Sequence, residues 1–180
     1  MVETNIFWPY LNPKDRWENR IEGRWEAQKS VLAYNITDDA NSAWQPGGCL
    51  QVSVNRAAHR VISCGSDKSG LGRWAWTRYR GRHNVTLRVV SAYRPCSSLN
   101  AGERTVLRQH ERFLLANGDE HSPRDAMLAD LCSEILLWRE AGDQIVLCID
   151  LNEDVSDSPG KRVYLHSYLL RSGLGWGYER

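Results

Sequence analysis

The sequence of 180 residues is poor in several features that would assign it to a class at once. It has no run near the ~18 consecutive apolar residues that a membrane helix requires, and it does not start with a basic stretch followed by an apolar segment. Its five cysteines are all at least 15 positions apart, so we expect neither a C-x-x-C zinc site nor a disulfide framework. These absences predict a soluble intracellular protein, nuclear or cytoplasmic, without a membrane partner.

What is present is the composition of an ordinary globular domain. Hydrophobic residues make up 42% of the chain and charged residues 25%, which excludes disordered, collagen-like and low-complexity classes. The length suffices for one domain with its own hydrophobic core. We therefore expect a single domain over residues 1–180.

Charge is distributed unevenly, although the net charge is only +1. From Arg56 to Arg94 the chain carries nine basic residues against one acidic residue, a local net charge of +8. From Glu103 to Asp157 it carries thirteen acidic residues and five arginines, a local net charge of −8. The pattern indicates either a basic surface and an acidic or metal-binding locus, or two solvated faces that neutralise each other.

The spacing of apolar residues predicts strands first and helices later. Strand-like runs cover 50–54, 60–64, 72–79 and 85–93, with a turn at 45–48 and a hairpin connection at Gly81. Helical patterns cover 103–115 and the stretch from Ser122 to Gly142, with further candidates near 16–28 and over 161–170. The apolar run 144–149 is typical of a strand that is covered on both faces. This order predicts a layered α/β or α+β sheet protein.

Polar side chains follow the predicted buried strand directly. Asp150 and Asn152 are two positions apart, so both are expected on one side of the chain at the carboxyl end of a central strand, where sheets commonly bind ligands. A carboxylate that activates water and an amide that donates to a phosphoryl oxygen suit phosphate-ester hydrolysis. The alternative is that both are ordinary turn residues.

Aromatic residues give two further candidates. Tyr93 ends the strand before Pro95, where its phenol is placed to donate to a phosphate or simply to contact water. Trp74 and Trp76 share one strand face, where they either stack on nucleic-acid bases or belong to the core.

In their order and spacing, several segments resemble the endonuclease/exonuclease/phosphatase superfamily, the metal-dependent fold of DNase I and the abasic-site endonucleases. The likeness runs from about residue 3 to about residue 155. A further segment, Gly70–Trp76, resembles members that accompany reverse transcriptases in retroelements. The superfamily-like segments are Glu3–Asn5, Gly47–Gly48, Ser91–Pro95 and Asp150–Asn152.

The resemblance implies a partial four-layer α/β sandwich, with two mostly antiparallel sheets flanked by helices, and a phosphodiesterase that uses Mg²⁺ or Mn²⁺. It implies that Glu3 binds the metal ion, that Asp150 positions or deprotonates the attacking water, and that Asn152 holds the phosphate or that water. Tyr93 would contact the phosphate. The implied partners are a nucleic acid, with DNA the first expectation, and a reverse transcriptase domain of the same polyprotein. The implied backbone contacts are Arg73, Arg78, Arg80, Arg82 and Arg94.

The chain also departs from the superfamily pattern. The first strand with its Asn and the closing Ser-Asp-His segment have no counterpart, and Ile149 stands where the superfamily usually has Gly. We therefore expect a copy truncated at both ends, with little or no activity as this polypeptide alone. Two alternatives stay open. A non-catalytic nucleic-acid-binding remnant would need no metal ion, and a lipid or inositol phosphatase would lack the steep salt dependence of phosphate-backbone binding.

Overall fold

The computed structural model describes residues 1–12, 19, 24–37, 44–97 and 102–152. These residues form a mixed α+β fold with two sheets. In chain order the elements are η1 (Trp8–Tyr10), β1 (Gln28–Ala33), β2 (Cys49–Val54), α2 (Asn55–Ala58), β3 (Val61–Ser66), β4 (Trp74–Arg80), β5 (Thr86–Tyr93), α3 (Val106–Ala116), α4 (Pro123–Glu140) and β6 (Asp143–Asp150).

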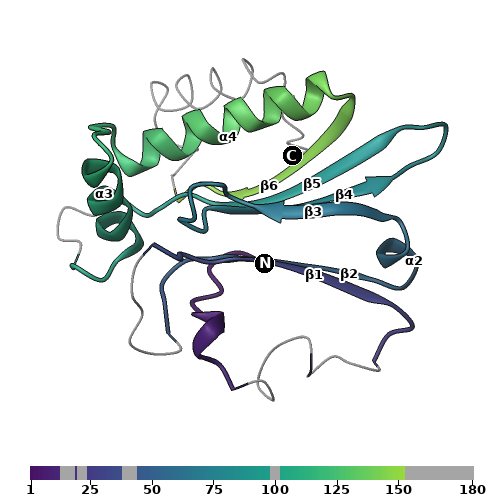
Figure 1. The fold of residues 1–180 in the computed structure, drawn as a ribbon, viewed down its shortest axis with the longest axis horizontal. Coiled ribbons are helices and arrows are strands. Elements are labelled where there is room, and N and C mark those ends of the chain that lie inside the picture. Colours follow the sequence, from purple (N-terminus) through teal and green to yellow (C-terminus); the bar gives the residue numbers. More distant parts are fainter. Residues whose placement is uncertain (13–18, 20–23, 38–43, 98–101, 153–180) are drawn as a thin grey trace, which may run out of the picture.

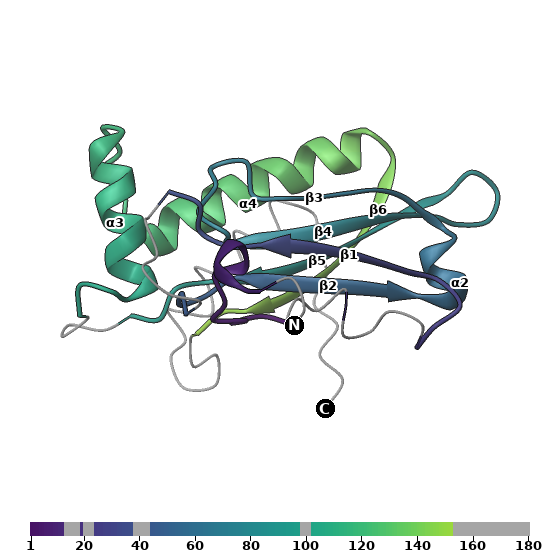
Figure 2. The same ribbon diagram turned by 60° about the horizontal axis from the view of Figure 1, so that its bottom comes forward.

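The larger sheet has the strand order β3-β4-β5-β6. Its first three strands pair antiparallel, whereas β5 and β6 pair parallel, so the chain between them crosses over through α3 and α4. In Figures 1 and 2, α4 covers one face of this sheet, the antiparallel pair β1-β2 covers the other face, and α3 lies at one end. Among the described residues, no helix is long and apolar enough to cross a membrane.

Apolar packing joins α4 to the larger sheet. Helix α4 begins where the sequence predicts, because the Ser122 side chain accepts a hydrogen bond from the Asp125 N–H and Pro123 occupies the first turn. The core between the helix and the sheet contains Trp74, Val90, Ala92, Met127, Leu128, Leu131, Ile135 and Trp138. Trp74 is only 2% exposed, and the ring of Trp76 lies 5.8 Å from that of Trp138. The two tryptophans therefore belong to the core.

The other face of the larger sheet carries a small apolar cluster around Ala75 and Tyr93 and, beside it, a set of buried polar groups. Gln51 of β2 donates to the carbonyl of Ala75 at 3.0 Å and to the hydroxyl of Ser91 at 3.1 Å. Its own side-chain oxygen accepts from the Thr77 hydroxyl at 2.7 Å. These buried groups satisfy one another, as buried polar groups must, and they fix how the two sheets lie against each other.

Strand β6 corrects one prediction. Ile145, Leu147 and Ile149 pack toward α4, but Val146 is 45% exposed and Cys148 is exposed on the opposite face. The reason is the width of the smaller sheet, since β1 contacts β3 and β4 while β2 contacts β4 and β5. The apolar run 144–149 is thus a strand covered on one face.

The N-terminal region holds a strand that the sequence patterns do not predict. β1 occupies Gln28–Ala33, and residues 24–27 before it are not helical, so the predicted helix near 16–28 is wrong at its end. Most of that predicted helix, and all of the one over 161–170, lies outside the described residues.

Candidate functional site at the end of the central strands

The rim formed by the carboxyl ends of β5 and β6 brings two predicted residues side by side. Tyr93 and Asp150 are register partners in the parallel pair, so their backbones are about 4.8 Å apart. Side chains at partner positions point to the same face of a sheet. Here that face is the one on which β1 and β2 pack.

Asp150 and Asn152 are held by a compact set of hydrogen bonds. The backbone N–H of Asn152 donates to Asp150 Oδ1 at 3.1 Å, and the Asn152 side-chain amide donates to the Arg94 carbonyl at 2.8 Å. Asn152 has a φ of 47°, a left-handed conformation that Asn tolerates better than most residues. The two residues make a turn, as the simpler interpretation predicts. Their remaining carboxylate oxygen and amide hydrogen are not used by these bonds.

Tyr93 connects this turn to the N-terminal segment. Its side chain is 4% exposed, and burial, together with the nearby carboxylate of Glu3, raises the pKa of the Tyr93 phenol. The phenol therefore stays protonated and acts as a donor. Its oxygen also lies 3.8 Å from Cys96 Sγ. The structure thus brings Glu3, an exposed residue near the chain start, to the buried hydroxyl of Tyr93.

Two glycines allow the N-terminal segment to approach. The N–H groups of Thr4 and Asn5 donate to the carbonyls of Gly48 and Gly47 at 3.3 and 2.8 Å. Both glycines have a φ of 84°, and a Cβ on Gly48 would stand 2.6 Å from Thr4 Oγ1. The Gly-Gly pair is therefore needed to seat the segment that carries Glu3.

Arg124, which the sequence analysis missed, ties the ends of both strands together. From the first turn of α4 its guanidinium donates to the carbonyl of Pro95 and, at 3.4 Å, to that of Asn152. Arg94 donates in turn to the Arg124 carbonyl at 3.3 Å and is only 3% exposed. Arg94, which the resemblance assigns to the nucleic-acid backbone, is thus placed inside the fold. Its position directly after the predicted helix start at Ser122-Pro123 is the sequence feature that could have indicated Arg124.

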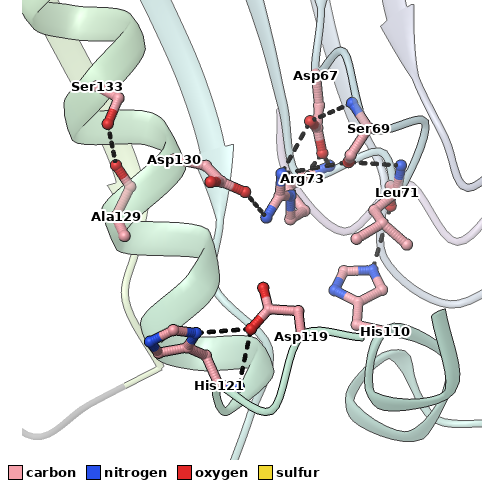
Figure 3. Close-up of polar contacts among 10 residues, drawn as sticks. All are labelled: Asp67, Ser69, Leu71, Arg73, His110, Asp119, His121, Ala129, Asp130 and Ser133. Atoms are coloured by element: carbon pink, nitrogen blue, oxygen red, sulfur yellow. Dashed lines mark hydrogen bonds and ion pairs between the residues drawn. The ribbon is translucent and has the colours of Figure 1, made fainter. Parts of the chain in front are cut away.

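Arg73 is likewise placed inside the fold, at 2% exposure (Figure 3). Its guanidinium lies 2.6 Å from Asp67 Oδ2 and 2.8 Å from Asp130 Oδ2. Burial alone would raise the pKa of Asp67, but the hydrogen bonds and charge of Arg73 outweigh it and lower that pKa. Arg73 therefore joins α4 to the loop before β4, away from the surface that a nucleic acid would contact.

A third set of ion pairs lies at the far end of the sheet. Asp143 at the start of β6 accepts from Arg78 Nε at 2.7 Å and from Arg88 Nη2 at 2.7 Å. The carboxylate is fully buried, and the hydrogen bonds from Thr86, Arg78 and Arg88 together outweigh burial and lower its pKa. The basic and acidic halves of the sequence thus neutralise each other partly through buried pairs.

Four exposed arginines remain at that far end, and we call them the hairpin cluster. They come from α2, from the residue before β3, and from the β4–β5 hairpin, which lie together in Figure 1. The N–H of Arg80 donates to the Arg60 carbonyl at 2.8 Å. The eight residues of β5 separate this cluster from the rim by roughly 23 Å, at ~3.3 Å per residue. The cluster consists of Arg56, Arg60, Arg80 and Arg82.

The rim offers few ligands for a metal ion. Within the part of the chain that the structure describes, no group of three or more His, Cys, Asp or Glu side chains is placed to hold one. Mg²⁺ commonly binds through one or two carboxylates, and waters and substrate phosphates complete its shell. Glu3, close to the Tyr93 phenol, supplies one such carboxylate, and Asp150 is the register partner of Tyr93 on β6.

Comparison with protein-family models, with curated proteins and with solved structures found no match to this chain.

Proposed function

We propose that the rim is a metal-dependent site for the hydrolysis of nucleic-acid phosphodiester bonds. One observation carries the proposal: the Tyr93 phenol lies close to the Glu3 carboxylate, and Tyr93 is the register partner of Asp150 across the sheet. Asn152 hydrogen-bonds with Asp150 through its backbone at the same strand end. Four residues from three distant segments thus meet at one rim.

Each residue has a chemical part to perform. The carboxylate of Glu3 would hold Mg²⁺ or Mn²⁺, which when bound offsets the negative charge that builds on the phosphoryl group. Asp150 orients the attacking water and accepts its proton. The Tyr93 hydroxyl and the second amide hydrogen of Asn152 donate to phosphoryl oxygens.

The proposal includes the finer architecture and the partners. The two sheets and α4 would form part of a four-layer sandwich, DNA would be the substrate, and a reverse transcriptase domain would share the polyprotein. The resemblance of Gly70–Trp76 supports the last point. An experimental structure with a helical layer on the outer face of β1-β2 would test the architecture.

Plasmid nicking in Mg²⁺ and in EDTA tests the activity. We expect slow nicking that needs the metal ion and that falls ~10²–10⁴-fold in Asp150→Ala, because a proton acceptor is lost. Glu120→Ala, at an exposed carboxylate outside the rim, is the matched control and should nick like the wild type. Binding of a short oligonucleotide gives a second readout. The proposal fails if Mg²⁺ promotes neither nicking nor binding, or if Asp150→Ala changes neither.

A second function, non-catalytic nucleic-acid binding, is favoured by the hairpin cluster. Its arginines are exposed and lie at the opposite end of the sheet from the rim. Such binding would need no metal ion and would weaken steeply with added salt. Metal-independent binding that is lost on substitution of Arg80 and Arg82, and untouched by Asp150→Ala, would establish this function in place of hydrolysis.

A further inference from the structure

A cavity of about 350 Å³ opens beside Tyr93. Its walls come from the loop before β2, from the end of β5 and from the first turn of α3. Most of the wall is apolar, and the size falls within the range of small-molecule sites. The lining residues are Trp44, Pro46, Tyr93, Cys96, Gly102, Arg104, Thr105, Val106 and Leu107.

The cavity is built by contacts that also build the rim. Trp44 bridges Ile6 in the N-terminal segment that carries Glu3. A Cβ on Gly47 would stand 3.0 Å from Val106 Cγ2 and 3.7 Å from the Tyr93 ring, so this loop packs closely on both. The ring of Tyr93 forms one wall, and the carboxylate of Glu3 lies close to its phenol. The cavity and the proposed phosphate site therefore share Tyr93.

The chemistry of the walls suits a flat aromatic group attached to an anion. Trp44 is 56% exposed although it lines the cavity, so its indole offers a stacking surface to solvent. Pro46 and Leu107 add apolar surface, and the exposed Arg104 brings a positive charge. Stacking of a nucleic-acid base on an aromatic side chain is worth about 1–3 kcal/mol.

We propose that this cavity receives the base of a nucleotide adjoining the phosphodiester at the rim, stacked on Trp44, with Arg104 near the next phosphate. The inference rests on the proposed function, because the shared Tyr93 places the base next to the scissile bond. A cavity that binds a peptide side chain would also be apolar. A peptide side chain, however, carries no phosphate for the proposed phosphate site at Tyr93 or for Arg104 to bind.

Equilibrium binding of two fluorescent single strands in Mg²⁺ tests the proposal. One strand is an oligothymidylate, and the other is an abasic strand of the same length and charge. We expect the wild type to bind the oligothymidylate at least about fivefold tighter, the lower bound of one stacked base. Trp44→Ala should abolish this difference, and Trp44→Phe should keep part of it.

Trp25→Ala is the matched control, since Trp25 is 36% exposed and lies outside the cavity. This variant should keep the full preference for the strand with bases. The proposal is overturned if the wild type binds both strands equally, or if the preference survives in Trp44→Ala. A preference lost equally in Trp25→Ala would also overturn it, because stacking would then not be local to the cavity.

Failure of the underlying function gives a different result. If the rim does not bind phosphodiesters, then removal of Mg²⁺ and the variant Glu3→Gln leave the affinity for the abasic strand unchanged. If only the base site is wrong, the abasic strand still binds in an Mg²⁺-dependent way, and Trp44→Ala has no effect on either strand.

Discussion

The two ends of the four-stranded sheet handle charge in opposite ways. At the hairpin end, Asp143 is buried between Arg78 and Arg88, so carboxylate and guanidinium groups neutralise each other directly. At the rim end, Asp150 accepts from a backbone N–H, and the carboxylate of Glu3 lies close to the phenol of Tyr93. The charged groups at the hairpin end stabilise the fold. The carboxylates at the rim end contact neutral groups instead, so they are available to bind a ligand.

The comparison also shows why local charge counts mislead. Of the nine basic residues between Arg56 and Arg94, three are buried and paired with acids from the second half of the chain. Only the hairpin cluster and Lys68 are exposed, and Lys68 is itself paired with Glu134. A basic stretch in the sequence thus becomes a small exposed cluster in the fold.

Removal of the Asp143 carboxylate at the hairpin end should have the largest effect, and this effect is on stability. Asp143→Ala leaves the buried guanidinium of Arg88 and the partly exposed one of Arg78 without their shared partner, and we expect a loss of about 3–5 kcal/mol in the free energy of unfolding. Urea denaturation followed by circular dichroism measures it, with Glu140→Ala on the exposed end of α4 as the control. A loss below about 1 kcal/mol would show that the two ends do not differ in this way.

Acid should destabilise the α3 side through His110. This residue is buried, its Nε2 donates to the Leu71 carbonyl at 3.2 Å, and its Nδ1 has no partner among the residues that the structure describes. Burial, with the nearby charge of Arg73, lowers the pKa of His110 from 6.5 to about 4. The unfolded chain therefore binds a proton between these values while the folded chain does not.

Stability from His110 is fully present above about pH 6.5 and is lost as pH falls toward 4, by up to about 3 kcal/mol. His110→Gln, which keeps a donor for Leu71, should flatten this loss in urea denaturation between pH 7 and pH 4.5. The exposed His59→Gln should keep the wild-type slope. Equal slopes in all three proteins would refute the assignment to His110.

Loss of the rim hydroxyl should affect binding more than folding. Tyr93→Phe removes the donor to a phosphoryl oxygen but keeps the ring that packs against Gly47 and Val106. We expect Mg²⁺-dependent oligonucleotide binding to weaken about tenfold and the free energy of unfolding to change by about 1 kcal/mol or less. An unchanged affinity with a large loss of stability would make Tyr93 a purely structural residue.

Substitution in the hairpin cluster should weaken nucleic-acid binding and lower its dependence on salt. If Arg80 and Arg82 contact phosphates, the double alanine variant should lower the slope of log K against log salt by roughly 0.7–0.9 per arginine. Lys29→Ala, an exposed cation on β1, is the control. If Asp150→Asn lowered this slope by the same amount, the two ends of the sheet would be coupled. That result would contradict the distinction drawn between them.

Local patterns predicted much of the fold. The strands predicted over 50–54 and 85–93 and the start of α4 at Ser122 are confirmed, because each depends on neighbours in sequence. β1 was missed because Gln28–Ala33 is short and gains its order by pairing with β2. The exposure of Val146 was also missed, since it depends on how far the smaller sheet extends.

For the candidate site, the sequence predicted where the two strands end better than it predicted what surrounds those ends. Tyr93 and Asp150 follow two strong strands, so their meeting at one rim could be expected. The burial of Arg73 and Arg94 could not, because their partners Asp67, Asp130 and Asp125 are set by tertiary contacts. Gly72 in the retroelement-like segment has a packing role too, as its Cβ would stand 2.4 Å from the carbonyl carbon of Tyr34.

The most direct measurement is the position of a bound Mn²⁺ ion, observed by the broadening of backbone amide signals in nuclear magnetic resonance spectra. We predict broadening centred on Glu3, Tyr93 and Asp150, strengthened by a phosphodiester oligonucleotide and lost in Glu3→Gln. Broadening elsewhere in the molecule, or none at all with the oligonucleotide present, would contradict the assignment of the rim as a metal-dependent phosphodiester site.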